Sequence, residues 1–123
     1  MTTYPPQEAA ARTGLSLDTL RYYERIGLID DVPRTTGGRR VYRDEHLDWL
    51  GVLTCLRRTG MPVRDMRRYA ELAREGADTE EERLRILEEH RRAVLADIAE
   101  LQEALRRVED KIEWYRQQRR NSS

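Results

Sequence analysis

The fold is decided by residues 16–27, which have the sequence SLDTLRYYERIG. Ser16 is a good helix N-cap because its hydroxyl accepts a hydrogen bond from a backbone N–H one turn on, and Gly27 is suited to end the helix. Residues 6–13 predict a shorter helix that has proline in its first turn and stops at Gly14. Two helices joined by a tight glycine-containing turn form a helix-turn-helix pattern. Spacing alone leaves its use open, because many helical proteins contain such a pair.

The stretch that follows this helix pair predicts a β-hairpin. Gly37 and Gly38 form a turn between two short runs that contain apolar residues. A hairpin placed directly after a helix-turn-helix is a wing. Arg39 and Arg40 leave its tip next to Tyr42, which suits contact with phosphates or a minor groove. The alternative is a solvated loop with ordinary surface arginines.

A second pair of helices is predicted after the hairpin. The first member begins near Asp44, a possible N-cap, and runs to about residue 59, and the second covers residues 62–75. Arg57 and Arg58 lie near the exposed edges of this pair, which would act as a second wing.

The last third of the chain predicts one long helix. Residues 79–82 have the sequence TEEE, which is typical of a capping box. About 40 residues at 1.5 Å each give a helix of roughly 60 Å, longer than the preceding residues can cover. A partner helix is therefore expected, and a homodimer supplies it most simply. Apolar residues recur at alternating steps of three and four, interrupted only at Arg91, and predict a coiled-coil seam of Leu84, Leu87, Val94, Ile98, Leu101, Leu105, Val108 and Ile112.

Charge is unevenly distributed along the chain. The 23 basic and 23 acidic side chains cancel overall. Residues 34–74, however, carry ten arginines against five acids, a net of 10 − 5 = +5, and residues 76–123 carry ten basic against twelve acidic side chains, a net of 10 − 12 = −2. A basic first part masked by an acidic second part is compatible with nucleic-acid binding.

Cys55 is the only cysteine, so no disulfide forms within one chain. No apolar stretch approaches the roughly 20 residues that span a bilayer, and the first residues do not have the pattern of a signal peptide. We expect a soluble cytoplasmic protein without a membrane partner. No Ser-His-Asp motif, phosphate loop or metal cluster is visible, so an enzyme is the least favoured class.

Residues 19–29, TLRYYERIGLI, resemble the recognition helix of the MerR family of bacterial transcription regulators. The flanking residues 11–16, 37–42 and 56–61 resemble the family's first turn, its first wing and the join of its second helix pair. The resemblance covers residues 4–75 in detail and the long helix in kind. It implies a mainly α protein with a winged helix-turn-helix domain over 1–75, a small β-hairpin wing, and a helix over 76–118 that forms an antiparallel coiled-coil dimer. Residues 119–123 are expected to be a disordered tail.

The resemblance also implies a mode of action. The partners would be double-stranded promoter DNA with inverted half-sites, a second copy of the chain, and RNA polymerase at the same promoter, and the dimer would distort DNA that has an overlong spacer. For each tyrosine the alternative is packing in the core, which is strongest for Tyr23 and Tyr42. The expected DNA-binding residues are Ser16, Thr19, Arg21, Tyr22, Tyr23, Arg25, Arg39, Arg40, Tyr42, Arg57 and Arg58.

Within the family, the chain is most similar to the AdhR- and NmlR-like branch, which responds to reactive aldehydes and nitrosative stress. Cys55 in the third helix and the closing pattern KIEWY at residues 111–115 carry this likeness. It implies that Cys55 senses electrophiles, because a thiolate attacks them and Arg57 and Arg58 would favour the thiolate. The alternative is an effector-independent regulator or architectural protein in which Cys55 is a small buried hydrophobe.

Two departures narrow the options. The family's metal sensors have cysteines at both ends of the long helix, where this chain has none, so no metal or other cofactor is expected. The drug-sensing members have a large C-terminal ligand domain, which is also missing from this sequence.

Overall fold

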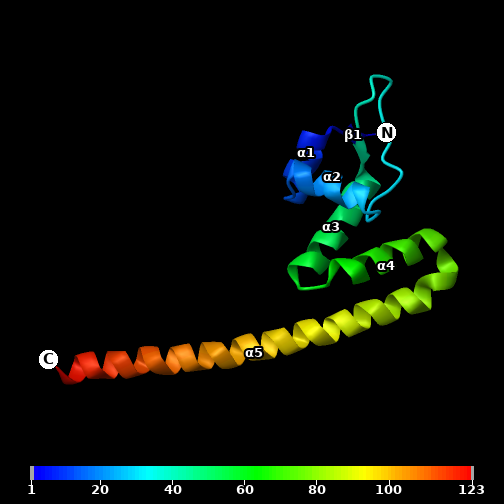
Figure 1. Cartoon of the computed structure of the whole chain (residues 1–123). Coiled ribbons are helices and arrows are strands. Elements are labelled where there is room, and N and C mark those ends of the chain that lie inside the picture. The colour runs from blue at the N-terminus through cyan, green and yellow to red at the C-terminus, as the bar shows by residue number, and fades with distance from the viewer. Residues whose placement is uncertain (1, 123) are drawn as a thin grey trace. The chain divides into compact units, whose positions relative to one another are not determined.

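The structure, a computed structural model, describes residues 2–122. One compact unit ends at Ile86 and a second begins at Leu87. Figure 1 shows the elements in chain order. They are β1 (Thr3–Tyr4), α1 (Pro6–Thr13), α2 (Leu17–Arg25), β2 (Tyr42–Arg43), α3 (Asp44–Arg58), α4 (Val63–Glu75), a 3-10 turn (Ala77–Thr79) and α5 (Glu80–Asn121).

The caps of the first helix pair form as the sequence predicts. Gly14 ends α1 with φ at 75°, a left-handed conformation that glycine adopts without a steric penalty, and its N–H donates to the Ala10 carbonyl at 2.9 Å. The Ser16 hydroxyl then accepts from the Thr19 backbone N–H at 3.0 Å and begins α2. These two caps fix the tight turn between α1 and α2.

The hairpin is confirmed, although it is smaller than a regular two-stranded ribbon. A turn over residues 35–38 is closed by the Gly38 N–H, which donates to the Thr35 carbonyl at 2.9 Å. The only bridge across its stem among residues 2–122 joins Arg34 and Arg40. The regular pairing is instead between β1 and β2, antiparallel, with Tyr4 opposite Tyr42. This pairing was not predicted, because two-residue strands give no periodic signal in the sequence.

The N-terminus of α3 differs in detail from the prediction. Arg43, not Asp44, occupies the N-cap position, and its backbone N–H donates to Nδ1 of His46 at 2.9 Å. The Asp44 carboxylate is used elsewhere, since it accepts a 2.6 Å hydrogen bond from the Tyr4 hydroxyl. This bond joins the N-terminal strand to the start of α3.

The core of the first unit lies among α1, α2, α3, α4 and the hairpin stem. α2 contributes Leu20, α3 contributes Leu50 and Leu53, and α4 contributes Met66, all at most 1% exposed. Burial of such side chains is the main stabilising contribution to a domain of this size. The buried apolar residues are Tyr4, Ala9, Leu20, Tyr23, Leu28, Ile29, Tyr42, Leu50, Leu53, Leu56, Met61, Met66, Ala70 and Leu72.

The long helix is present, with corrections at both ends. The Thr79 hydroxyl does not form the predicted capping box, because it donates to the carbonyls of Leu72 at 2.6 Å and Gly76 at 2.8 Å and accepts from Arg83 Nε. At the other end α5 continues through Asn121, so residues 119–121 are helical rather than part of a disordered tail, and Ser123 lies outside the described residues. No residue of α5 is buried. None of the described helices has an apolar run long enough to cross a membrane.

Candidate nucleic-acid interface

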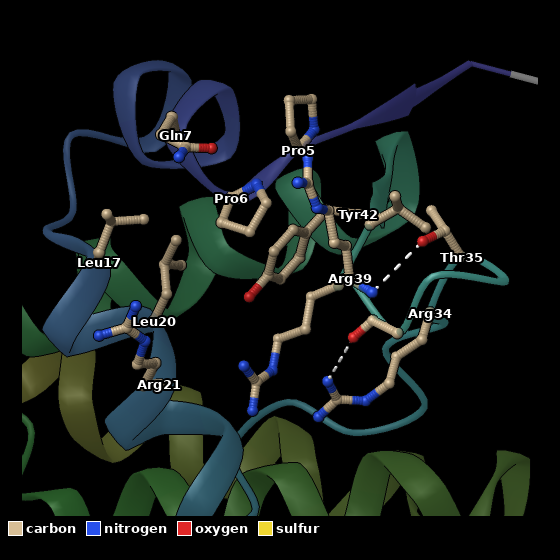
Figure 2. A pocket seen from close by; sticks show the side chains of 13 residues that line it. Pro5, Pro6, Gln7, Leu17, Leu20, Arg21, Arg34, Thr35, Arg39 and Tyr42 are labelled. Atoms are coloured by element: carbon tan, nitrogen blue, oxygen red, sulfur yellow. Dashed lines mark hydrogen bonds between the residues drawn. The ribbon is translucent and has the colours of Figure 1, made fainter.

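A groove of about 510 Å³ lies between the start of α1, helix α2 and the hairpin (Figure 2). Apolar side chains, among them Leu17, Leu20 and Tyr42, line part of it. Four arginines also line it: Arg21 comes from α2, and Arg34, Arg39 and Arg40 come from the hairpin. Guanidinium groups form forked hydrogen bonds with phosphate oxygens, so this groove suits a polyanion.

Local bonds hold the hairpin in shape around these arginines. Nη1 of Arg34 donates to the Gly38 carbonyl at 3.1 Å, and the Thr35 hydroxyl accepts from the Arg39 backbone N–H at 3.3 Å, as the dashed lines in Figure 2 show. Among residues 2–122 the Arg39 guanidinium has no ion-pair partner within 4.0 Å. Its charge is therefore available to an external anion.

The Arg40 guanidinium, unlike that of Arg39, is held by an ion pair. Its Nε lies 2.6 Å from Oε2 of Glu24, and both side chains are about two-thirds buried or more. This ion pair connects the hairpin stem directly to α2. The two elements that line the groove are thus fixed relative to each other.

The outer face of α2 displays five of the residues that the sequence singled out. The hydroxyls of Ser16 and Thr19 are 2.9 Å apart at the first turn. Arg21 is 61% exposed on its side chain and lies 3.6 Å from the fully solvated Asp18. One turn further on, the Arg25 guanidinium lies 5.4 Å from the ring centroid of the half-exposed Tyr22. This face offers hydroxyl, guanidinium and phenol donors to an external partner.

Tyr23 and Tyr42 were expected to contact DNA, and the structure corrects this expectation. Tyr23 is 5% and Tyr42 1% exposed, so both side chains belong to the core. Burial raises the pKa of the Tyr23 phenol, and the neighbouring Arg57 opposes the rise. Burial also raises the pKa of Tyr42; Glu24 adds to that rise, while Arg40, Arg21 and Arg34 oppose it. The apolar ring determines where each tyrosine lies, and the alternative of core packing holds for these two side chains but not for the exposed Tyr22.

Arg57 and Arg58 do not line the groove. Nη1 of Arg57 lies 3.4 Å from the Met61 carbonyl at the end of α3. The Arg58 side chain lies beside the turn between α1 and α2. Its Nη2 is 3.5 Å from the position that a Cβ on Gly14 would occupy. These two adjacent arginines therefore have different surroundings, both outside the arginine-lined groove.

Cys55 lies on α3, in a second groove that Arg58 also lines. A groove of about 560 Å³ is lined by Cys55, Arg12, Arg58 and neighbouring residues of α1 and α3. The thiol is exposed, so the alternative of a buried core cysteine does not hold for the single chain. The described residues include no cluster of three His, Cys, Asp or Glu side chains that would hold a metal ion.

Three side chains at or beside the site were not predicted from the sequence. Arg34 lines the groove, and the hairpin register that pairs it with Arg40 would have indicated it. Trp49 and Arg74 hold the backbone that leaves α2: Trp49 Nε1 donates to the Leu28 carbonyl and Arg74 Nη1 to the Gly27 carbonyl, both at 2.8 Å. No sequence pattern predicts these long-range bonds to backbone atoms.

Comparison with known proteins identifies the family. The family model of MerR HTH family regulatory proteins matches residues 4–73, and that of the MerR DNA-binding region matches residues 47–111. The chain belongs to the MerR family. An HTH-type transcriptional regulator of Haemophilus influenzae is 42% identical to this MerR-family chain over 113 residues, which are 92% of this chain and 84% of that protein. The regulator AdhR of Bacillus subtilis is 38% identical over 88 residues, 72% of this chain and 63% of AdhR.

The solved structures agree with this assignment. The MerR family regulator HiNmlR, described as lacking the sensor domain and solved bound to promoter DNA, matches with a TM-score of 0.86 and 40% identity, covering 94% of this chain and 92% of that one. A MerR family regulator from Listeria monocytogenes matches with a TM-score of 0.85 and 39% identity, covering 90% of this chain and 84% of that one. The predicted fold class, a mainly α MerR-like helix-turn-helix protein with a long C-terminal helix, is confirmed. The likeness to the AdhR and NmlR branch is confirmed as well.

Proposed function

We propose that this MerR-family chain is a transcriptional regulator that binds promoter DNA at inverted half-sites as a homodimer. The observation that carries the proposal is the arginine-lined groove between α2 and the hairpin. Helix α2 would lie in the major groove, with Thr19, Arg21, Tyr22 and Arg25 toward base edges and phosphates. Arg39 and Arg40 of the wing would contact the phosphate backbone, which sets position rather than sequence preference. Arg57 and Arg58 would form a second, weaker phosphate contact.

The surface of α5 supports the homodimer. None of its residues is buried, and large apolar side chains such as Leu101 at 70% and Leu105 at 56% are exposed along the heptad seam. A continuous exposed apolar stripe of this kind marks an interaction surface. An antiparallel coiled coil between two copies would bury it and relate the two DNA-binding units by a twofold axis. The half-sites would then be inverted repeats.

We further propose that the dimer bends promoter DNA that RNA polymerase also occupies. The support is the family membership together with the similar HiNmlR, which was solved on promoter DNA. A duplex with fluorophores at its two ends would report the bend as a rise in energy transfer on binding. Unchanged transfer at saturating protein would rule out the distortion, although not the binding.

Binding is tested with duplexes that the protein selects from a random library. Fluorescence anisotropy across several salt concentrations should show tight binding that weakens steeply with salt, because phosphate contacts release counterions. Arg21→Ala and Arg39→Ala should each weaken binding by about tenfold, the loss of one charged hydrogen bond. Arg92→Ala on α5 is the matched control and should bind like the parent. Binding that ignores inverted repeats, or equal effects of all three substitutions, would contradict the proposal.

A sensing role for Cys55 is a second proposal, supported by the exposure of the cysteine in a groove that Arg12, Asp48 and Arg58 also line. The thiolate form of a cysteine is the form that attacks aldehydes and nitrosating agents. An adduct at Cys55 would alter the groove beside the helix-turn-helix turn. A promoter reporter with and without formaldehyde should respond in the parent and stay constant in Cys55→Ser. A response that persists in Cys55→Ser would favour the effector-independent alternative.

A further inference from the structure

Glu24 is a carboxylate that is paired with Arg40, one of the arginines that line the groove. An acidic side chain at a surface that binds DNA needs an explanation. It lies on α2, and its Oε2 is 2.6 Å from Nε of Arg40 on the hairpin. Carboxylates repel phosphates, so an acidic side chain on a DNA-binding face lowers the affinity for DNA unless it also stabilises a contact that favours binding. A solvated acid such as Asp18, 96% exposed on the same helix, has no comparable contact.

The burial of this pair distinguishes it from an ordinary surface salt bridge. The Arg40 side chain is 31% and the Glu24 side chain 26% exposed, while the ion pair of Arg21 with Asp18 is largely solvated and that of Arg12 with Glu8 is about half exposed. Solvated pairs contribute little, whereas a partly buried, short, charge-assisted bond holds its partners in one geometry. The same Glu24 acts on the Tyr42 phenol at the groove, where Arg40, Arg21 and Arg34 act with opposite sign. Glu24 and these three arginines therefore all influence the same buried phenol.

The atoms used in the bond determine what remains for DNA. Arginine has five N–H donors, and only Nε of Arg40 is engaged by Glu24. Among residues 2–122 no other hydrogen bond of the Arg40 guanidinium is found. Its Nη donors are consequently available, and the guanidinium plane is fixed by the contact with α2.

We propose that Glu24 is a positioning residue for DNA recognition. It holds the wing residue Arg40 against the recognition helix α2, so that the Nη donors of Arg40 meet a phosphate of the bound DNA. This inference rests on the proposed function. It makes an unusual prediction, because removal of a negative charge from the DNA-binding face weakens binding. If Glu24 only repelled phosphate, its removal would strengthen the binding of DNA.

The test is a double-mutant cycle of Glu24→Ala and Arg40→Ala, with Asp18→Ala as the matched acidic control on the same helix. The probe is the duplex that the parent protein selects from a random library, measured by anisotropy at several salt concentrations. Glu24→Ala and Arg40→Ala should each weaken binding by about tenfold and lower the salt slope by about one phosphate contact. The double variant should be no worse than either single variant, since both lose the same contact. Asp18→Ala should bind as tightly as the parent or more tightly.

Glu24→Gln supplies a rescue, because an amide oxygen still accepts from Nε without the charge, and its affinity should lie between those of the parent and Glu24→Ala. Glu24→Ala that binds like Asp18→Ala would overturn the inference. Additive losses in the double variant, or a weakened affinity with an unchanged salt slope, would assign Glu24 a purely structural role and overturn it as well. A parent protein that selects no duplex would instead refute the proposed function itself.

Discussion

Leu101→Ala is the most direct test of the homodimer. Leu101 lies on the heptad seam of α5 and is 70% exposed in the single chain. Covering that fraction of a leucine stabilises an interface by about 1.5 kcal/mol, given roughly 2 kcal/mol for complete burial. Because the substitution occurs in both copies, the dimer should lose about 3 kcal/mol, or roughly a hundredfold in dissociation constant. Alanine has the highest helix propensity, so α5 itself should remain helical.

The assay is sedimentation velocity over a dilution series, with circular dichroism to confirm that helix content is unchanged. Leu95→Ala is the matched control, because Leu95 is the same residue type, 57% exposed, and one position away from the seam. It should shift the dissociation constant far less than Leu101→Ala. Equal shifts for the two substitutions, or a parent protein that sediments as a monomer at micromolar concentration, would refute the heptad argument.

Three further predictions concern the first unit. Ser16→Ala removes the acceptor of the Thr19 N–H and should destabilise the unit by about 1 kcal/mol, seen as a lower midpoint in thermal unfolding. Gly14→Ala places a Cβ at φ 75° and should lower the midpoint of urea unfolding by an amount equivalent to roughly 1 kcal/mol, whereas an unchanged midpoint would contradict the left-handed cap. Burial raises the pKa of Tyr42 above its ordinary value of 10.0, so its contribution to stability is complete below pH 10.0 and is lost as the pH rises through the folded-state pKa. Tyr42→Phe should therefore make the alkaline fall in melting temperature shallower, and an equally steep fall would count against this origin.

Local signals were sufficient to predict the helix pair, the hairpin and the long helix. Ser16 and Gly14 have their effect within one turn, so their chemistry is visible in the sequence. The alternating seam of α5 is likewise a periodic property of one segment. These features belong to neighbouring residues, and tertiary packing did not change them.

Long-range features could not be predicted in the same way. The pairing of β1 with β2 joins residues about forty positions apart, and the Tyr4 hydroxyl also donates to Asp44 across the same separation. Tyr22 and Tyr23 are adjacent and chemically identical, yet only the direction of α2 against the core makes the first half-exposed and the second buried. The ion pair of Glu24 was the hardest feature to predict, because its partner Arg40 is on the hairpin and the pattern of α2 alone indicates an ordinary surface acid.

The two side chains that donate hydrogen bonds to the backbone just after α2 have a consequence for protein engineering. Trp49 and Arg74 come from α3 and α4, and each binds a carbonyl directly after α2. A chimera that transplants only residues 2–43 into another scaffold would lack both side chains, and the backbone after α2 would lose these two hydrogen bonds. The smallest portable DNA-reading module therefore extends to the end of α4, almost twice the length of the helix-turn-helix and wing.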